Sequence, residues 1–387
     1  MNFGRLFKQT HSKIPIKRWI SGPPTGNSAP LDFDAVIVGG GIVGCATARQ
    51  LLIQKPNLKI AIIEKEDKLG LDLSYKFFDE NKIPYKKTGK LIVAVEPIEV
   101  ERLENLFKRA QQNGCRDIEV IDGSKIKDYE PHCKGLKALW SPHTGIVDWG
   151  FVTTKFAEDF ENRGGKVFVN YPFVKVASNS DPERPIRIFS GPGNARNPDP
   201  KIVPFRGEYL LLKPEKRYLV KGNIYPVPDP RFPFLGVHFT PRMNGDVWLG
   251  PNAVLAYKRE GYSYFDISPT DLMESLSYSG MRKLMGKYFS FGVQEFYRGV
   301  WIAAQVKQLQ RFVPELKFSD VTRGPAGVRA QAMDANGNLV DDFVFDSGKG
   351  ELSSNILNVR NAPSPAATSS LAIAEMIVEE VVNRFKL

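Results

Sequence analysis

The chain has 387 residues, of which 42% are hydrophobic and 25% are charged, and its formal net charge is +10. These values are typical of a soluble globular protein that is long enough for two domains. No apolar run reaches the roughly 20 residues that a membrane-spanning helix requires. Half of the charge excess lies before Asp32, so the rest of the chain gives no indication of a nucleic-acid partner.

The N-terminal stretch is basic and contains no acidic residue before Asp32. Its positive charges are Arg5, Lys8, Lys13, Lys17 and Arg18. With the interspersed hydroxyl and apolar residues, this pattern predicts a mitochondrial targeting segment and linker over residues 1–30. The alternative is a disordered basic tail without a targeting role. Three cysteines fit a reducing compartment, and no Cys and His spacing matches a zinc site, so no metal is expected.

The first regular elements form a β-α-β pattern. Residues 33–41 are an apolar, β-branched run closed by glycines, which predicts a buried strand. Residues 42–54 are predicted as a helix that ends before Pro56, and residues 58–65 as a second buried strand. The connection between the two strands should be right-handed.

The next elements alternate between strands and helices. Residues 89–97 predict a strand ended by a proline, and residues 96–114 predict an amphipathic helix with a glycine at its C-cap. Residues 145–171 predict a helix, a Gly-Gly stop and a strand. Residues 178–200 are rich in Pro, Gly, Ser and Asn, which predicts a long loop.

The second half of the chain is rich in strands. Antiparallel strands are predicted between residues 208 and 252 and at 343–346, with a turn at Asn244-Gly245. Residues 353–361 predict a late buried strand, and residues 365–385 a final helix. The candidate buried residues of this helix are Ala372, Met376, Val378, Val382 and Phe385. The order predicts an α/β fold, in which a Rossmann-like domain is interleaved with an antiparallel-sheet substrate domain.

Gly39, Gly41 and Gly44 match the dinucleotide-binding pattern GxGxxG. Gly39 permits a tight turn from strand to helix, Gly41 lets the backbone approach a pyrophosphate, and Gly44 lets the helix pack on the strand. The helix N-terminus favours phosphate because its N–H groups are free. Glu64 ends the second strand, where its carboxylate would accept hydrogen bonds from ribose hydroxyls. The motif does not separate FAD from NAD, but its N-terminal position and the late helix favour FAD.

Residues 201–262 (KIVPFRGEYLLLKPE…), 323–346 (RGPAGVRAQAMD…) and 358–377 (NVRNAPSPAATSS…) carry a specific resemblance. They resemble the mitochondrial L-2-hydroxyglutarate dehydrogenases, a family with the D-amino-acid-oxidase-like FAD fold, and the likeness extends over most of residues 31–387. The resemblance implies FAD-dependent oxidation of L-2-hydroxyglutarate to 2-oxoglutarate in mitochondria. It also implies that electrons pass to the respiratory chain rather than to NAD. A peripheral contact with the inner membrane is compatible with this electron transfer.

The resemblance indicates three candidate catalytic residues. The chemistry needs a base for the hydroxyl proton while hydride leaves C2, and His238 in GVHFTP is the candidate, with a buried, satisfied histidine as the alternative. Arg329 in GPAGVRAQ is the candidate for holding a substrate carboxylate, with a surface ion pair as the alternative. Arg206 in PFRGEY could face the cofactor or substrate, or only anchor a strand. Lys258 and Arg259 could meet the distal carboxylate, or be solvated charges.

The resemblance also implies cofactor contacts outside the glycine motif. Gly327, just before Arg329, suits a backbone that comes close to a flavin. Small residues before the last helix would let its N-terminus approach the flavin or its ribityl chain, the alternative being N-capping by Thr368 or Ser369. The expected cofactor-binding residues are Gly39, Gly41, Gly44, Glu64, Lys65, Gly327, Pro363, Ser364, Ala366, Ala367 and Thr368.

The resemblance divides the chain into alternating segments after its N-terminal 30 residues. Residues 31–78, 144–200 and 319–387 are expected to form the FAD-binding domain, its second part incomplete. Residues 79–143 and 201–318 are expected to form the substrate domain.

The sequence departs from the family at two places in the FAD-binding domain. Residues 64–95 run from the acidic residue to a substrate-domain strand without the Gly-, Ser- and His-containing loop that meets the cofactor in the family. Residues 181–197, with three prolines, replace a buried strand that ends in a glycine turn against FAD. The structure should therefore look least like a flavoenzyme at residues 70–75.

Losing a central parallel strand exposes apolar faces and ladder groups, so weak FAD binding, or none, and low stability are expected. Three functions stay open: an active dehydrogenase, a catalytically impaired isoform that lacks flavin-binding segments, and a related FAD-dependent oxidase of amino acids or glycerol phosphate.

Overall fold

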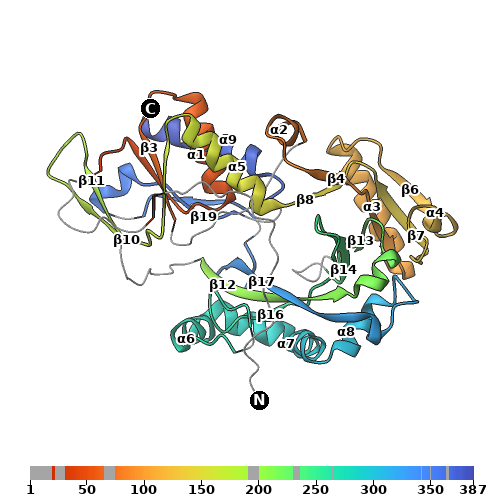
Figure 1. Cartoon of the computed structure of the whole chain (residues 1–387). Coiled ribbons are helices and arrows are strands. Elements are labelled where there is room, and N and C mark those ends of the chain that lie inside the picture. Colours follow the sequence, from red (N-terminus) through yellow and green to blue (C-terminus); the bar gives the residue numbers. More distant parts are fainter. Residues whose placement is uncertain are drawn as a thin grey trace, which may run out of the picture.

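The computed structural model describes residues 20–21, 31–64, 75–190, 200–229, 236–263, 265–340, 342–348, 350–362 and 366–387. Two main β-sheets organise these residues, a small parallel sheet and a large mixed sheet (Figure 1).

The parallel sheet has the strand order β1-β9-β3-β2. These strands are β1 (Ile20–Ser21), β9 (Lys166–Val169), β3 (Ile60–Glu64) and β2 (Ala35–Val38), and the helices beside them are α1 (Ile42–Gln54), α5 (Trp149–Asn162) and α9 (Ser370–Phe385). Ile60 and Ile62 of β3 belong to the core formed with α1 and α5, whereas Ala61 and Ile63 pack toward Phe168 on the other face. The predicted β-α-β unit is confirmed.

Strand β2 forms one edge of the parallel sheet. It pairs with β3, and no described strand pairs with its other side. The late strand β19 (Asn358–Asn361) pairs instead with β18 (Val344–Asp346). Val38 at the end of β2 is 50% exposed, although the first strand of a nucleotide-binding sheet is normally buried between neighbours. This arrangement agrees with the expected loss of a strand from the sheet.

The segment predicted as a long loop contains part of a β-hairpin. Strands β10 (Phe173–Ser178) and β11 (Ile186–Ser190) are antiparallel and pair only with each other among the described strands. The prediction of a loop over 178–200 is therefore wrong for residues 186–190, because two isoleucines and a phenylalanine favour a strand there despite the surrounding prolines. The hairpin lies outside the parallel sheet, as the prolines predicted.

The large sheet has the order β16-β12-β15-β14-β13-β5-β7-β6, and β17 pairs with β12. Its strands are β5 (Lys90–Ala94), β6 (Glu119–Asp122), β7 (Lys137–Ser141), β12 (Lys201–Leu212), β13 (Asn223–Pro226), β14 (His238–Pro241), β15 (Val247–Gly250), β16 (Val254–Leu255) and β17 (Val321–Met333). Its pairs are antiparallel except β13 with β5, which is parallel. The predicted turn at Asn244-Gly245 joins β14 to β15, and Gly245 has the positive φ of +86° that favours glycine.

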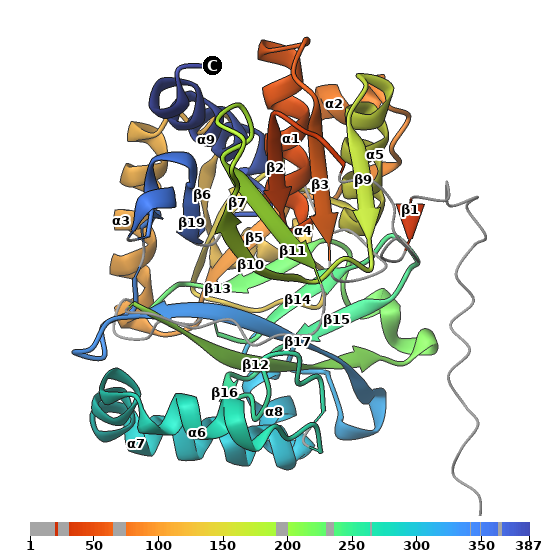
Figure 2. The same ribbon diagram turned by 90° about the vertical axis from the view of Figure 1, so that its left-hand side faces the viewer.

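Three helices lie along one side of the long β12–β17 pair (Figure 2). They are α6 (Pro269–Ser277), α7 (Ser279–Val300) and α8 (Ile302–Leu309). Val306 and Leu309 of α8 share a core with Leu210, Leu212 and Phe239 of the sheet. The sequence pattern assigned no element to this stretch. Short 3₁₀ turns η2 (Pro214–Leu219) and η3 (Phe318–Asp320) flank β12 and β17.

Strands β5, β6 and β7 of the large sheet carry α3 (Pro97–Gln112), which confirms the predicted amphipathic helix. It packs through Leu103, with Val100, Leu106 and Phe107 beside it. The remaining short elements are η1 (Gly123–Lys125), α4 (Ile126–Tyr129) and η4 (Glu351–Asn355).

A small aromatic cluster packs against the core of the parallel sheet, just after the place where the flavin loop was expected to be missing. Helix α2 (Tyr75–Glu80) precedes β4 (Tyr85–Lys87), which pairs with β8 (Gly145–Val147). The hydroxyl of Tyr75 donates to the carbonyl of His143 at 2.7 Å, and its ring contacts those of Phe78 and Tyr85. Of residues 70–75, only Tyr75 is among the described residues, so the expectation for the other five lies outside them.

The buried face of the last helix was predicted in part, because Val378 is buried and Val382 packs against the same core, as expected. Ala372 and Met376 are exposed, so their prediction as buried residues is wrong. The buried residues of α9 are Ser370, Ile373, Ala374, Ile377 and Val378. The helix has apolar residues on several sides, so its sequence alone did not define which of them meets α1.

Candidate active site

The glycine turn between β2 and α1 has the geometry of a nucleotide-binding turn. Gly39 has φ +104°, and its N–H donates to the carbonyl of Ile63 at 2.8 Å. A Cβ on Gly44 would lie 2.0 Å from the carbonyl oxygen of Gly39, whereas a Cβ on Gly39 or Gly41 would meet nothing within 4 Å. The first and second glycines therefore border open space at the start of α1, and the third is required for packing.

Glu64 closes this turn from the end of β3. Its side chain is largely buried, and its Oε2 accepts from the N–H of Gly40 at 2.7 Å. The carboxylate therefore lies beside the turn, as the predicted ribose-binding acid should. The turn, the acid and the free N-terminus of α1 fit the pyrophosphate and ribose end of FAD.

The residues before α9 lie close to the same part of the fold, because α9 packs against α1. Ala366 and Ala367 are half-buried, and Thr368 is exposed, in the turn that precedes the helix. Lys65, Pro363 and Ser364 lie outside the described residues. Within the described part of the chain, no group of three or more His, Cys, Asp or Glu residues could hold a metal ion.

His238 is a buried, neutral imidazole in β14. Its ring stacks on Tyr225 with centroids 4.6 Å apart and an interplanar angle of 18°. Its Nδ1 lies 3.1 Å from the carbonyl oxygen of Gly236. A carbonyl only accepts, so Nδ1 carries the proton and Nε2 is left as an acceptor. Burial lowers the pKa of His238 to about 4, and the positive charge of Arg329 lowers it too, while the hydrogen bond to Gly236 opposes both.

The space around Nε2 depends on Gly250, which is paired with His238 across β14 and β15. A Cβ at this position would lie 3.0 Å from Nε2 of His238 and 2.8 Å from Cε1 of Tyr209. The ring of Tyr209 meets the imidazole edge-on, with centroids 6.3 Å apart. Sequence reasoning missed Gly250, Tyr209 and Tyr225, since only the strand register reveals that they surround His238.

Arg329 and Gly327 lie two residues apart on β17 and so present the same face. Arg329 is opposite Phe205 of β12, and Gly327 is opposite Gly207. A Cβ on Gly327 would meet nothing within 4 Å. Arg329 is close enough to His238 for its charge to lower the pKa of the imidazole. Of the three predicted catalytic residues, His238 and Arg329 therefore interact electrostatically, and Arg329 lies two residues from the open backbone at Gly327.

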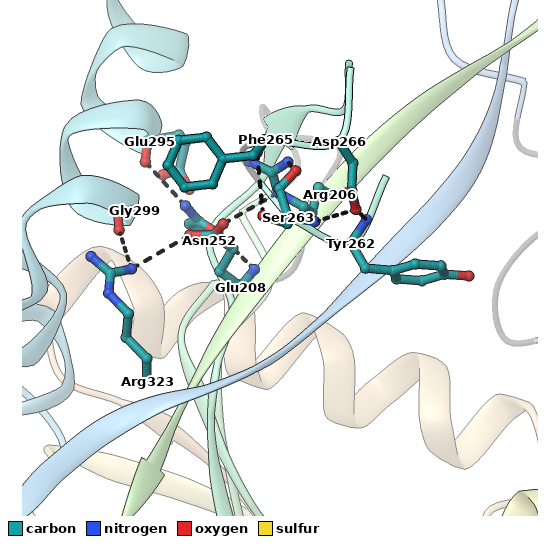
Figure 3. Close-up of polar contacts among 10 residues, drawn as sticks. All are labelled: Arg206, Glu208, Asn252, Tyr262, Ser263, Phe265, Asp266, Glu295, Gly299 and Arg323. Atoms are coloured by element: carbon teal, nitrogen blue, oxygen red, sulfur yellow. Dashed lines mark hydrogen bonds and ion pairs between the residues drawn. The ribbon is translucent and has the colours of Figure 1, made fainter. Parts of the chain in front are cut away.

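Arg206 belongs to a different network. Because Phe205 is paired with Arg329, the next residue of β12 points to the opposite face of the strand. Arg206 is fully buried, its Nη1 donates to the carbonyl of Ser263 at 2.6 Å, and its Nε lies 3.2 Å from Oε1 of Glu208 (Figure 3). These contacts are those of a strand anchor, the alternative considered for this residue.

A cavity of about 730 Å³ lies beside this network. Its polar lining includes Glu208, Asn252 and Arg323, all drawn in Figure 3, and its apolar lining includes Phe265 and Phe296. Arg323 donates to the carbonyls of Gly299 and Val300 at the end of α7. Neither His238 nor Arg329 lines this cavity.

The two weaker candidates for the distal carboxylate differ in their contacts. Arg259 is paired with α6, because its Nη2 lies 2.5 Å from Oε2 of Glu274 and its N–H donates to Asp271. Lys258 is exposed at the start of the same loop, which fits the solvated charge considered as its alternative. Arg259 therefore supports the loop after β16 rather than pointing into open space.

The sequence matches the family described as "FAD dependent oxidoreductase" (DAO) over residues 34–77 and 68–380. It is 67% identical to the mitochondrial L-2-hydroxyglutarate dehydrogenase of Caenorhabditis elegans, with 96% of this chain and 98% of that protein covered. The human protein of the same name is 49% identical, with 92% and 90% covered. The chain belongs to the FAD-dependent oxidoreductases, in the L-2-hydroxyglutarate dehydrogenase family.

Solved structures support the fold of this family. An L-α-glycerophosphate oxidase of Mycoplasma pneumoniae with FAD bound has a TM-score of 0.63 at 18% identity, covering 92% of this chain and 95% of its own. An L-proline dehydrogenase of P. horikoshii has a TM-score of 0.59 at 17% identity, with 92% and 94% covered. At such low identity the likeness concerns the fold alone.

Two features of the comparisons bear on the expected gaps. The alignment with the C. elegans relative covers 425 residues, which exceeds the 387 residues of this chain, so part of it must lie opposite gaps. The family match is also broken into two pieces, which overlap at residues 68–77. This is the place where the sequence lacks the expected flavin loop. The edge position of β2 corresponds instead to the second expected gap, where residues 181–197 replace a buried strand of the family.

Proposed function

We propose that this chain oxidises L-2-hydroxyglutarate to 2-oxoglutarate in mitochondria, with FAD as the hydride acceptor. The observation that carries the proposal is the buried His238, whose Nδ1 faces the Gly236 carbonyl so that Nε2 is left to accept, within the electrostatic reach of Arg329. The names of the C. elegans and human relatives supply the substrate and the compartment.

In this proposal His238 accepts the proton of the C2 hydroxyl at Nε2. The low pKa keeps the imidazole unprotonated at mitochondrial pH, so the base is ready when substrate binds. Arg329 holds the carboxylate next to C2 through charge-assisted hydrogen bonds. FAD, when bound, supplies the hydride acceptor.

Arg206 supports the site indirectly in this proposal. It ties β12 to the loop that contains Ser263, opposite the face with Arg329. Replacing Arg206 should therefore lower the stability of the fold more than it changes substrate recognition. Loss of the fully buried guanidinium would leave Glu208 and the Ser263 carbonyl without this partner.

The glycine turn, Glu64 and the residues before α9 are proposed to hold FAD, with Gly327 facing the flavin. The division into three FAD-binding segments and two substrate-domain segments is proposed with them. Electrons would leave the flavin for an acceptor of the respiratory chain, at a peripheral contact with the inner membrane.

A catalytically impaired isoform is the second candidate function, and the edge position of β2 favours it. A sheet without the strand next to β2 should bind FAD weakly, because the cofactor would lose the contacts of that strand. A related oxidase of amino acids or glycerol phosphate is the third candidate function. Its support is limited to the fold that this chain shares with solved oxidases such as the L-α-glycerophosphate oxidase.

A substrate panel tests the proposal. The purified chain, supplied with excess FAD, should reduce an artificial dye with L-2-hydroxyglutarate, but not with the D-enantiomer, glycerol 3-phosphate or L-proline. Dye reduction with an amino acid or glycerol phosphate in place of L-2-hydroxyglutarate would refute the assignment, and no reduction with any substrate would favour the impaired isoform.

A further inference from the structure

Helix α7 has an exposed apolar face that no described part of the chain covers. After a kink at Tyr288, apolar side chains recur three or four residues apart and lie on one side of the helix. This α7 stripe consists of Phe289, Val293, Phe296, Tyr297 and Val300, which are between 46% and 67% exposed. Met285 before the kink and Trp301 after the helix extend it.

The buried side chains of α7 are separate from the stripe: Glu295 is buried after the kink, and two apolar residues are buried before it. Met281 and Leu284 are buried in a core with Val203 and Phe205 of β12. The α7 stripe is therefore an additional apolar face and not a part of the core. Contiguous exposed apolar surface of this kind usually marks an interaction site.

The charges of α7 indicate what the stripe meets. Arg282, Lys283 and Lys287 are exposed next to its N-terminal end. The single acidic residue of α7 is Glu295, which is buried and paired with Arg298. An apolar face with aromatic side chains and a basic rim is typical of a helix that lies in the surface of an anionic membrane.

A second copy of the chain fits the rim less well, because two such faces would bring two basic rims into one interface. The stripe also borders the cavity beside Arg323, since Phe296 and Val300 line both. Among the described residues, no helix is both long and apolar enough to cross a bilayer.

We propose that the α7 stripe docks this protein on an anionic phospholipid surface, with Arg282, Lys283 and Lys287 contacting the headgroups. The inference rests on the membrane contact proposed above and names the surface that makes it. Figure 2 shows α7 on the side of the large sheet away from the parallel sheet, so docking would leave the glycine turn clear of the membrane.

The test is sedimentation of the full chain with phosphatidylcholine vesicles, with and without an anionic phospholipid. The wild-type chain should sediment with the anionic vesicles, and the double variant Phe289→Glu, Val293→Glu should lose at least tenfold in binding. Ile98→Glu is the matched control, because Ile98 is an equally exposed apolar residue on α3, and it should bind like the wild type. The double variant Lys283→Gln, Lys287→Gln should lose roughly fivefold per lysine on anionic vesicles.

The proposal is wrong if the wild-type chain ignores both kinds of vesicle, or if Ile98→Glu loses as much binding as the stripe variant. It is also wrong if the stripe variant only converts a dimer into a monomer in light scattering. Dye reduction in solution should be the same in all three variants. A chain that binds vesicles but reduces no dye would uphold the docking surface and refute the proposed activity.

Discussion

At the residue scale, His238 combines features that a general base needs. The hydrogen bond to Gly236 directs the proton to Nδ1, and burial keeps the ring neutral. The sequence motif indicated the residue, but it could not indicate the tautomer, which depends on the carbonyl of Gly236 just before strand β14. It also placed Arg206 in the same site, whereas strand pairing turns Arg206 and Arg329 to opposite faces.

Replacing His238 by Gln should lower kcat by about 10²–10⁴-fold, the usual loss of a general base.

The same histidine should make stability depend on pH. Its pKa of about 4 in the folded chain lies below the ordinary value of 6.5, so as pH falls the imidazole is protonated in the unfolded chain before it is protonated in the folded chain. The stability that the neutral ring provides, about 3 kcal/mol, is complete above about pH 6.5 and is lost as pH falls to about 4. Urea unfolding at pH 7 and pH 4.5 should show this loss in the wild type and not in H238Q.

The matching pH profile separates catalysis from stability. With FAD saturating, kcat/KM should show no limb from His238 between pH 5 and pH 8, because the base is already unprotonated. A limb with an apparent pKa near 6.5 that disappears in H238Q would contradict the buried, neutral histidine.

Gly250→Ala and Gly327→Ala form a matched pair. The new Cβ at Gly250 would press on Nε2 of His238 and on Tyr209, so kcat/KM should fall at least tenfold while FAD affinity stays the same. The new Cβ at Gly327 meets no protein atom, so the melting temperature should stay the same and FAD affinity should fall. Equal effects of both substitutions on FAD affinity would refute the assignment of Gly327 to the flavin side.

At the element scale, the edge position of β2 is the feature that separates this chain from a complete nucleotide-binding sheet. On its open side the N–H groups of β2 lack strand partners among the described residues, while β3 is paired on both sides. Hydrogen exchange measured by mass spectrometry should therefore be faster in residues 35–38 than in 60–64. Equal protection of both strands would mean that another part of the chain covers β2.

Long periodic patterns predicted their elements well, and short or ambiguous ones did not. The glycine-closed strand, α1 and α3 were predicted because composition and end signals agree. Strand β11 was missed because prolines and glycines surround a strand of five residues. The buried face of α9 was predicted correctly at Val378 and wrongly at Ala372 and Met376. Apolar residues occur on several sides of the helix, and only its packing on α1 decides between them.

At the scale of the whole molecule, two parts of the chain differ in completeness. The large sheet carries both His238 and Arg329 on strands of one continuous sheet. The parallel sheet keeps the glycine turn and Glu64, but β2 lies at its edge among the described strands. The resemblance located both gaps, yet how the remaining strands pair across them depends on tertiary contacts that no local pattern encodes.

The most direct measurement is L-2-hydroxyglutarate-dependent dye reduction as a function of added FAD, with the flavin content of the purified chain determined in the same sample. The account predicts much less than one FAD per chain after purification, and activity that rises with added FAD until it saturates. One tightly held FAD per chain, with activity independent of added FAD, would contradict the incomplete flavin domain. No activity at saturating FAD would contradict the proposed active site.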